Sequence, residues 1–450
     1  MTNDEFQPPN LKKIFYKTIR HFFPDFRSWL RSLEDPRQEN SCRYSLETML
    51  WVGLLLFLLK RDSRRQINYD FNSERFVRNL SFLVKADLAR LPHGDTLGNL
   101  LADFDYWQLY NLRVQLVNQL IRNKCLAKFR LNGYYLIGID GTGLMSFERR
   151  HCDQCLTREV ETKRGKKTIY YHQVVDAKLV SYNGFALSVE TEFIENREVG
   201  QDPQDCELNA TYRLLARLGE RFPQLRICLL LDGLYANEEI FDICKKNKWK
   251  YIIVFKEGSL PETYVEYESL KKRCVDNRGE YETEEEKQHY QWVEGINYKW
   301  QDKYFINVLE SVVEKKQSKN NDEIMKWLWV TNFNINKSNY AYLANKGGRL
   351  RWKVENEGNN TQKNGGYNLE HAYSYNFVAM KNFYVLLQIA HLINQLVEKG
   401  SLLTAQDWKY LGSIKNLTRR LFEDLRYNLF DRKAVETDLE KTFQIRFDTS

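Results

Sequence analysis

Two aspartates that end apolar segments are the strongest candidates for chemistry in this sequence. Asp140 ends the apolar run 134–139 and Asp232 ends the run 226–231, and a glycine follows each of them. A carboxylate at the end of a buried strand lies at the rim of a sheet, where open α/β sheets bind ligands. If the two strands are neighbours, the carboxylates repel each other unless a cation lies between them. An Asp-Gly turn is common for structural reasons alone, so the argument depends on the pair.

A third carboxylate is expected on a helix that packs against this sheet. In the segment 348–357, Arg351 and Glu355 are four residues apart, which places them on one helical face. An acid beside a guanidinium stays ionised, and the guanidinium can also bind a phosphate through two hydrogen bonds. A plain ion pair on a helix surface is the simpler interpretation of this spacing. Glu357 and Glu370 are competing candidates for the third carboxylate.

Three carboxylates offer hard oxygen ligands, which favour Mg²⁺, with Mn²⁺ as a substitute, over zinc. Two such ions could activate the attacking oxygen and stabilise the leaving oxygen of a phosphodiester. The sequence therefore predicts metal-dependent phosphoryl transfer.

The elements that must position these acids form a mixed α/β layer. Asp176, Glu190 and Glu192 fall on two of its strands, where a solvated strand edge is expected. A turn at 182–184 joins those two strands. Apolar runs predict strands at 134–140, 172–179, 185–189, 226–231 and 251–255, with helices at 207–222 and 238–246.

Composition agrees with a folded protein and places the positive charge in the first third. The 450 residues are 43% hydrophobic and 28% charged, which excludes wholesale disorder. Residues 1–130 hold 21 Lys and Arg against 14 Asp and Glu, so the whole net charge of +7 lies there. A basic region suggests a polyanion partner. The longest apolar run, 49–59, is too short to span a membrane, and a cytoplasmic protein is expected.

The segments 139–142, 231–236 and 351–355 resemble the three motifs of DDE transposases from bacterial insertion sequences. The closest group carries a β-rich insertion in an RNase H-like core and a third motif written Y-x2-R-x3-E-x6-K. The resemblance covers residues 134–397. It implies that Asp140, Asp232 and Glu355 form the catalytic, metal-binding triad and that Arg351 contacts DNA phosphate. It also implies cleavage at the element's end, followed by attack of the freed 3′-hydroxyl on target DNA.

The sequence departs from that third motif at two positions. Gly348 stands at the tyrosine position and Gln362 at the lysine position, although Lys363 follows it and is a candidate DNA contact. An RNase H-like nuclease without strand transfer is therefore an alternative, as is a transposase-derived DNA-binding protein without activity. The expected partners are double-stranded DNA, as element ends and target, and a second copy in a synaptic dimer near the bacterial nucleoid.

The resemblance implies five segments in an α/β fold with an RNase H-like mixed sheet flanked by helices. A long amphipathic helix is expected at 377–397, and a single basic amphipathic helix at 408–430. The segments are a helical, basic, DNA-end-binding region (1–130), the first part of the core (131–255), a β-rich insertion (256–347), the second part of the core (348–400) and a C-terminal helical region suited to dimerisation (401–450).

A second possible metal-binding motif consists of histidine and cysteine residues and does not include the acidic candidates. His151, Cys152 and Cys155 suit one half of a zinc site, and His172 is the nearest candidate for the other half. A single C-x2-C is weak evidence and His172 is not in a paired motif, so reduced thiols are expected.

Overall fold

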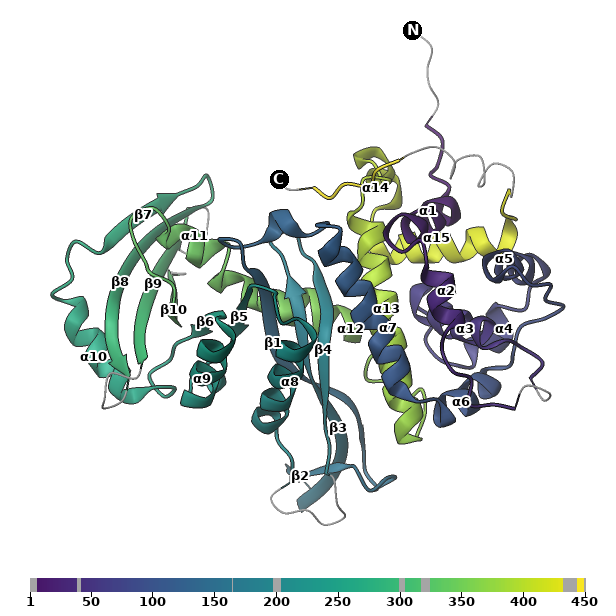
Figure 1. Ribbon diagram of the computed structural model, residues 1–450, viewed down its shortest axis with the longest axis horizontal. Helices are drawn as coiled ribbons and strands as arrows, with labels where there is room; N and C mark the ends of the chain where they lie inside the picture. Colours follow the sequence, from purple (N-terminus) through teal and green to yellow (C-terminus); the bar gives the residue numbers. More distant parts are fainter. Residues whose placement is uncertain are drawn as a thin grey trace, which may run out of the picture.

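The computed structural model describes residues 6–38, 42–163, 165–196, 204–298, 304–316, 324–431 and 443–448. They form a mixed α/β protein in which one mixed sheet is flanked by helices, as predicted at that level. A helical region built from both ends of the chain lies beside the sheet (Figure 1). No helix in the described ranges has the length and apolar character needed to cross a membrane.

The N-terminal region consists of helices, and one of them is buried on every side. Helix α3 (Leu46–Leu58) exposes none of its faces, as expected for a helix that is apolar all round. Ser45 caps it by accepting a hydrogen bond from the Thr48 backbone N–H. Apolar residues at three- and four-residue spacing over 45–59, 76–88 and 106–121 predict three helices here, which correspond to α3, α5 and α7, while the other four were missed. Besides α3, the region contains α1 (Leu11–Phe22), α2 (Phe26–Arg31), α4 (Gln66–Asp70), α5 (Glu74–Val84), α6 (Gly94–Asp103) and α7 (Tyr106–Arg122).

The sheet has ten strands in the order β2-β3-β1-β5-β6-β10-β9-β8-β7, with β4 paired to β3 off this path. The five strands predicted for the core are present, and β2 was missed. The first six strands are β1 (Tyr135–Phe147), β2 (Leu156–Thr162), β3 (Gly165–Val180), β4 (Ala186–Ile194), β5 (Ile227–Leu231) and β6 (Lys250–Val254).

The centre of the sheet is parallel and its margins are antiparallel. Strand β1 pairs in parallel with β5, and β5 with β6. Helices α8 (Glu207–Arg221) and α9 (Glu238–Asn247) precede β5 and β6, so each serves as the crossover that a parallel strand requires. Strands β3 and β4 form an antiparallel hairpin at the predicted turn, where Gly184 has a φ of 88° that favours glycine.

Residues 256–347 extend the same sheet instead of forming a layer of their own. Strand β10 (Ile324–Thr331) pairs antiparallel with β6 and is followed outward by β9, β8 and β7. Trp292 and Trp329 are fully buried on these strands. The other elements of this segment are α10 (Pro261–Lys271), β7 (Arg278–Glu282), β8 (Glu286–Tyr298), β9 (Tyr304–Lys315) and α11 (Tyr340–Asn345).

The segment expected to carry the third acid is helical, but it is not a regular α-helix. A 3-10 turn η4 (Gly348–Arg351) leads into a π-helix η5 (Val354–Asn360), and α12 (Thr361–Asn364) follows. Glycines allow η5 to lie close to the sheet: a side chain at Gly138 would clash with Val354, and one at Gly358 would clash with Lys178. Tight packing over β1 and β3 thus accompanies the wider turn of η5, a feature often found at functional sites.

Helix α13 (Phe377–Lys399) lies between the sheet and the helical region (Figure 1). The prediction that it is amphipathic was wrong, because every residue from Ala379 to Val397 is buried. It packs against α3, α6 and α7 on one side and β4 on the other. Its polar side chains bond inward: Asn382 donates to the carbonyls of Leu101 and Phe104.

The C-terminal region contains two helices where one was predicted. Gly412, with a φ of 72°, ends α14 (Ala405–Leu411) before α15 (Ile414–Tyr427) begins. Helix α15 packs on α1 and α5, and Asn79 of α5 donates to the Leu425 carbonyl. The apolar side of α15 is therefore covered within the chain, and a dimer would need another surface.

Candidate active site

The two predicted aspartates lie on or next to neighbouring strands. Over four consecutive pairs, ending with Gly138 and Leu230, each β5 residue lies 92 positions after its β1 partner, and Asp140 and Asp232 have the same separation two residues beyond the last pair. Asp232 directly follows β5. Asp140, in contrast, lies within β1, which continues to Phe147 and pairs Asp140 with Asp176 of β3, so the expectation that Asp140 ends its strand was wrong.

Asp140 lies where its ionised form is disfavoured. Burial, the largest effect, raises the pKa of Asp140 to about 6, and the negative charges of Glu207 and Glu355 act in the same direction. Arg351 lowers that pKa, as does a hydrogen bond of 3.2 Å from Asn359 Nδ2 to Asp140 Oδ2. The fold therefore brings two further acids and one arginine to Asp140, among them the predicted Glu355 and Arg351.

The three candidates for the third carboxylate lie in different surroundings. Glu355 is exposed on η5 and acts electrostatically on Asp140. Glu357 forms an ion pair of 3.5 Å with Lys353 on its own helix. Glu370 forms one of 2.8 Å with Lys363. The geometry favours Glu355.

Asp232 is the more exposed of the two aspartates. It caps the short η3 helix (Gly233–Tyr235), where its carboxylate accepts a hydrogen bond of 2.8 Å from the Gly233 N–H. Lys256, in the loop after β6, lies 3.9 Å from the same carboxylate. Since both side chains are largely solvated, this pair is weak and can open for a ligand.

A fourth carboxylate, Glu207, was not predicted. It is the first residue of α8, and its side chain accepts hydrogen bonds of 2.7 Å from the Tyr235 hydroxyl and 3.0 Å from Gln173 Nε2. It lies directly over Gly141, where any larger residue would clash with it. One feature of the sequence could have indicated Glu207: it is an acidic residue at the start of the first helix after the β3–β4 hairpin.

The residues at the two positions that depart from the third motif, Gly348 and Gln362, are both buried. A side chain at Gly348 would clash with the Trp329 ring, so no tyrosine fits there. Gln362 is fully buried and donates to Gln388 Oε1 at 2.8 Å. Lys363 beside it is partly exposed and occupied by its ion pair with Glu370.

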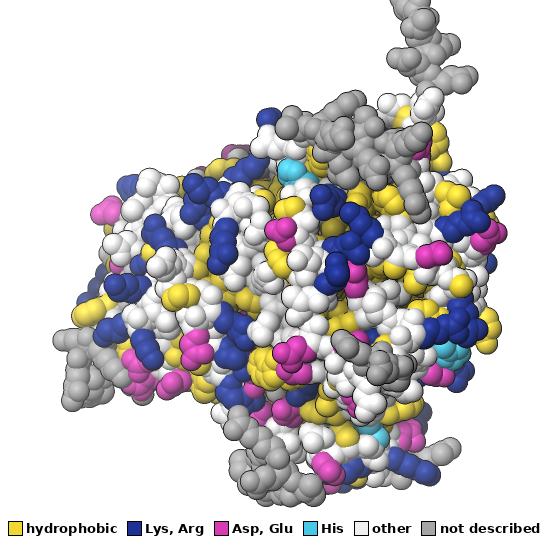
Figure 2. Space-filling view, turned by 45° about the vertical axis from the view of Figure 1, so that its right-hand side comes forward, with side chains coloured by type: hydrophobic (Ala, Val, Ile, Leu, Met, Phe, Trp, Pro, Cys, Tyr) yellow, Lys and Arg dark blue, Asp and Glu magenta, His cyan; other side chains and the backbone are white. Residues whose placement is uncertain are grey.

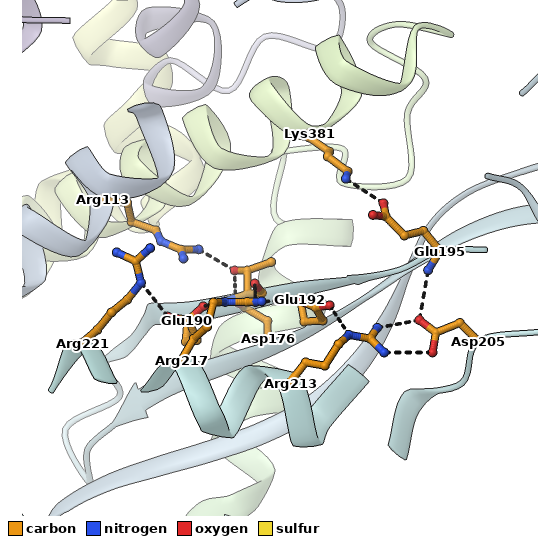
Figure 3. A network of polar contacts seen from close by, with 11 residues as sticks. Arg113, Asp176, Glu190, Glu192, Glu195, Asp205, Arg213, Arg217, Arg221 and Lys381 are labelled. Carbon is orange, nitrogen blue, oxygen red and sulfur yellow. Dashed lines mark hydrogen bonds and ion pairs between the residues drawn. The ribbon is translucent and has the colours of Figure 1, made fainter. Parts of the chain in front are cut away.

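An ionic network holds α8, the helix of Glu207, against the sheet (Figure 3). Arg217 contacts Glu190 and Glu192 of β4, and Arg213 contacts Glu192 and Asp205. Figure 3 also shows Arg113 of α7 reaching the same strand. These contacts fix the position of the first turn of α8.

The expectation of a solvated strand edge for Asp176, Glu190 and Glu192 was wrong. Asp176 has no exposed surface, pairs with Lys178 and accepts hydrogen bonds from Ser188 (2.7 Å) and Thr191 (2.6 Å). Helices α8 and α13 cover both faces of these strands. Buried charges of this kind persist only when they are paired.

Some of the basic residues in the N-terminal region form ion pairs within the protein. Lys12 is buried in an ion pair of 2.8 Å with Asp424, and Arg64 lies 3.1 Å from Asp95. In contrast, the basic residues at the end of α7 and in the following turn are exposed: Arg122, Lys124, Lys128 and Arg130.

The donor types suit hard divalent cations, but among the described residues the carboxylate oxygens do not gather within ligand distance of one another. Asp140, Asp232, Glu355 and Glu207 present carboxylate oxygens, the ligand type preferred by Mg²⁺ and Mn²⁺. The buried Oδ1 of Asn359, whose amide binds Asp140, has no hydrogen-bond partner among the described residues. A cation here would relieve the repulsion among the acids that disfavours ionised Asp140.

Without metal, Asp140 should reduce stability in a pH-dependent way. Its pKa rises on folding from 3.8 to about 6, so the native state binds the proton more tightly, and stability falls as pH rises through that window. Asp140→Asn should therefore stabilise the metal-free protein by about 1–3 kcal/mol at pH 8 and by almost nothing below pH ~4. Urea unfolding in EDTA at both pH values measures this. Asp87→Asn, at an exposed site, is the control, and an unaltered or lower stability of Asp140→Asn at pH 8 would contradict the burial argument.

No protein-family model matches the chain, and no curated protein matches it significantly. The interpretation of the site therefore rests on its own geometry: Asp140 within β1, with Glu207, Glu355, Arg351 and the buried amide of Asn359 around it, and Asp232 directly after the neighbouring strand β5.

Proposed function

We propose that this protein is a DNA transposase of the DDE type, which cuts the ends of an insertion sequence and joins them to target DNA. The observation that supports the proposal is the parallel pairing of β1 and β5, the strands that carry or precede Asp140 and Asp232, together with the effect of Glu355 and Arg351 on Asp140. In this proposal the β1, β5 and β6 strands with α8 and α9 form an RNase H-like core. Residues 256–347 are the insertion, and it continues the core sheet.

Each residue has a role that follows from its position. Asp140, Asp232 and Glu355 would hold Mg²⁺, which supplies activation of the attacking oxygen and stabilisation of the leaving oxygen. Arg351, beside Asp140, would bind a phosphate of the DNA end and hold it in line. Glu207 holds the Tyr235 hydroxyl and Gln173, and thereby supports the rim around Asp140.

The basic N-terminal region is joined to the segment that follows the third acid. Asn368 donates a hydrogen bond of 3.1 Å to the Asp62 carboxylate, and Lys60 lies over the Tyr367 ring. Arg65, in the same basic loop, is exposed. DNA held by the helical region could therefore continue past η5 toward the acids. Figure 2 shows Lys and Arg side chains spread over one face of the molecule, with acidic side chains between them.

DNA binding should weaken steeply with salt, because phosphate contacts release counterions. The double variant Arg122→Ala/Lys124→Ala should reduce the slope of log K against log salt by roughly 1–2. Fluorescence anisotropy with a labelled duplex of the element end measures it. Lys245→Ala/Lys246→Ala, an exposed pair on α9, is the matched control. A flat salt response, or equal slopes in all three proteins, would exclude the α7 end as the DNA contact.

An RNase H-like nuclease without strand transfer is the second candidate. The observation that favours it is the burial of the two positions at which the transposase motif has tyrosine and lysine, Gly348 and Gln362. If those side chains are needed to hold a cut end, this chain would cleave DNA without joining it. A catalytically inactive DNA-binding protein is less favoured, since such a protein has no need to gather four carboxylates.

Pre-cut DNA ends separate the two enzymes. The substrate would be a duplex ending in the inverted repeat that flanks the gene, with a free 3′-hydroxyl, incubated with supercoiled plasmid and Mg²⁺. A transposase yields joined products, which Asp140→Asn does not form. Cutting of uncut ends without any joining would support the nuclease and overturn the transposase proposal. Double-stranded DNA, a synaptic homodimer and a cytoplasmic, nucleoid-associated location remain part of this proposal.

A further inference from the structure

Four potential metal ligands converge at the outer end of β1, apart from the carboxylates. His151, Cys152 and Cys155 lie in the connection from β1 to β2, and His172 lies on β3. One ligand atom from each lies within 4.8 Å of all the others. The antiparallel pairing of Met145 with His172 and of Leu156 with Tyr171 brings the connection back over β3. The sequence alone had left the second half of this motif open.

The separations between these atoms match a tetrahedral site. Cys152 Sγ lies 3.4 Å from Cys155 Sγ and 3.3 Å from His172 Nε2, and Cys155 Sγ lies 3.5 Å from His151 Nδ1 and 3.7 Å from His172 Nε2. Zinc bonds of ~2.3 Å to sulfur and ~2.0–2.1 Å to nitrogen, in a tetrahedron, place ligand atoms about 3.3–3.8 Å apart. An ion at the centre would thus need little movement of the chain.

The surroundings suit a closed, structural site. Cys155 is fully buried and His172 is 2% exposed. Aromatic rings surround the histidines: Phe147 lies 4.0 Å from His151, and Phe377, at the start of α13, lies 5.4 Å from His172, measured between ring centroids. With four protein ligands, no position remains for water or substrate, which distinguishes structural from catalytic zinc.

We propose that His151, Cys152, Cys155 and His172 bind one zinc ion, which fastens the β1–β2 connection to β3. Two thiolates and two neutral imidazoles balance the charge of Zn²⁺, so the ion can be buried there without another counterion. The site does not depend on the proposed DNA chemistry, because its ligands are separate from Asp140, Asp232 and Glu355. Its purpose is to hold the outer ends of β1 and β3, the same strands that carry Asp140 and Asp176.

Zinc content is the first test. Protein produced with added zinc and dialysed against buffer should contain one equivalent by mass spectrometry of the metal. Cys155→Ser and His172→Ala should lose it, while Cys274→Ser and His289→Gln, outside the cluster, should retain it. The conservative variant His151→Cys should keep zinc, since cysteine supplies a ligand. Wild-type protein without zinc, or unchanged zinc in Cys155→Ser and His172→Ala, overturns the proposal.

Cobalt provides a second readout that does not require a folded variant. Wild-type protein loaded with Co²⁺ alone should show the thiolate charge-transfer band and the intense d–d bands of a tetrahedral S₂N₂ site, and zinc should abolish both. A strong zinc chelator should lower the Tm of the wild type without affecting that of Cys155→Ser. Octahedral cobalt spectra, or a Cys152–Cys155 disulfide in protein kept under reducing conditions, would instead show that the cysteines act as a thiol pair. Asp140→Asn should keep the zinc, which separates this result from failure of the carboxylate site.

Discussion

Asp140→Asn and Asp232→Asn should each lower Mg²⁺-dependent cleavage of the element end on the order of 10³-fold or more. Under the proposed mechanism, each substitution removes one negatively charged oxygen ligand while keeping the size of the side chain. Binding of the uncut end should persist, because the phosphate contacts lie elsewhere. A gel assay of cleavage and anisotropy of binding on the same substrate measure the two effects.

The control for this experiment is Asp87→Asn, an exposed aspartate of the helical region. It should leave cleavage unaffected. Undiminished cleavage in both Asp140→Asn and Asp232→Asn would show that the metal assignment is wrong. Loss of DNA binding along with cleavage would instead indicate that these residues support the fold.

The third carboxylate can be assigned by matched variants in the same assay. Glu355→Gln should match the loss seen for Asp140→Asn, because Glu355 acts on Asp140 directly. Glu357→Gln and Glu370→Gln should retain most of the activity, since those acids are held by Lys353 and Lys363. A larger loss in Glu357→Gln or Glu370→Gln than in Glu355→Gln would transfer the assignment.

Asp176→Ala should destabilise the protein by about 3–5 kcal/mol, the largest expected effect on folding. Asp176, Lys178 and Arg113 are all without exposed surface, and Asp176 is the anion that both cations face. Removing it leaves buried positive charge without a partner. Urea unfolding followed by circular dichroism would measure the free energy of unfolding.

The paired variant Asp176→Leu/Lys178→Met is the control for this argument. Replacing both members of this buried ion pair by apolar residues should recover the part of the loss that comes from unpaired Lys178, while the part that comes from Arg113 should remain. A loss below about 1 kcal/mol in Asp176→Ala, or no recovery in the double variant, would contradict the pairing of Asp176 with Lys178.

Local sequence patterns predicted the helices and strands that have a clear run or spacing of apolar residues. The apolar run before Asp232 is strand β5, and the run before Asp140 is the first part of β1, which continues to Phe147. Helices α8 and α9 lie within a residue of their predicted bounds. The sequence could not predict that β1 and β5 are neighbours, because a crossover helix permits several strand orders. The separation of 92 residues between the two aspartates matters only because the structure pairs these two strands with the same offset.

Other features depend on contacts between distant segments and could not be predicted. Helix α13 was expected to have a polar side, but Asn382 and Gln395 bond to backbone groups of other elements, so it is buried all round. The π-helix η5 likewise packs closely over Gly138, a contact between segments far apart in the chain that no local propensity encodes. Whether a polar side chain is buried depends on the segments that pack against it, and these segments are distant in the sequence.

The amino-acid sequence by itself determined which carboxylates are candidates, since their position after apolar runs depends on local hydrophobic patterning alone. Only the tertiary structure decided that Glu207 joins them, that Glu355 is favoured over Glu357, and that His172 completes a cluster with His151, Cys152 and Cys155. The physical reason is the same in each case. Charge repulsion and metal coordination act over a few ångströms in space, and that proximity is set by strand order and helix packing between residues far apart in the chain.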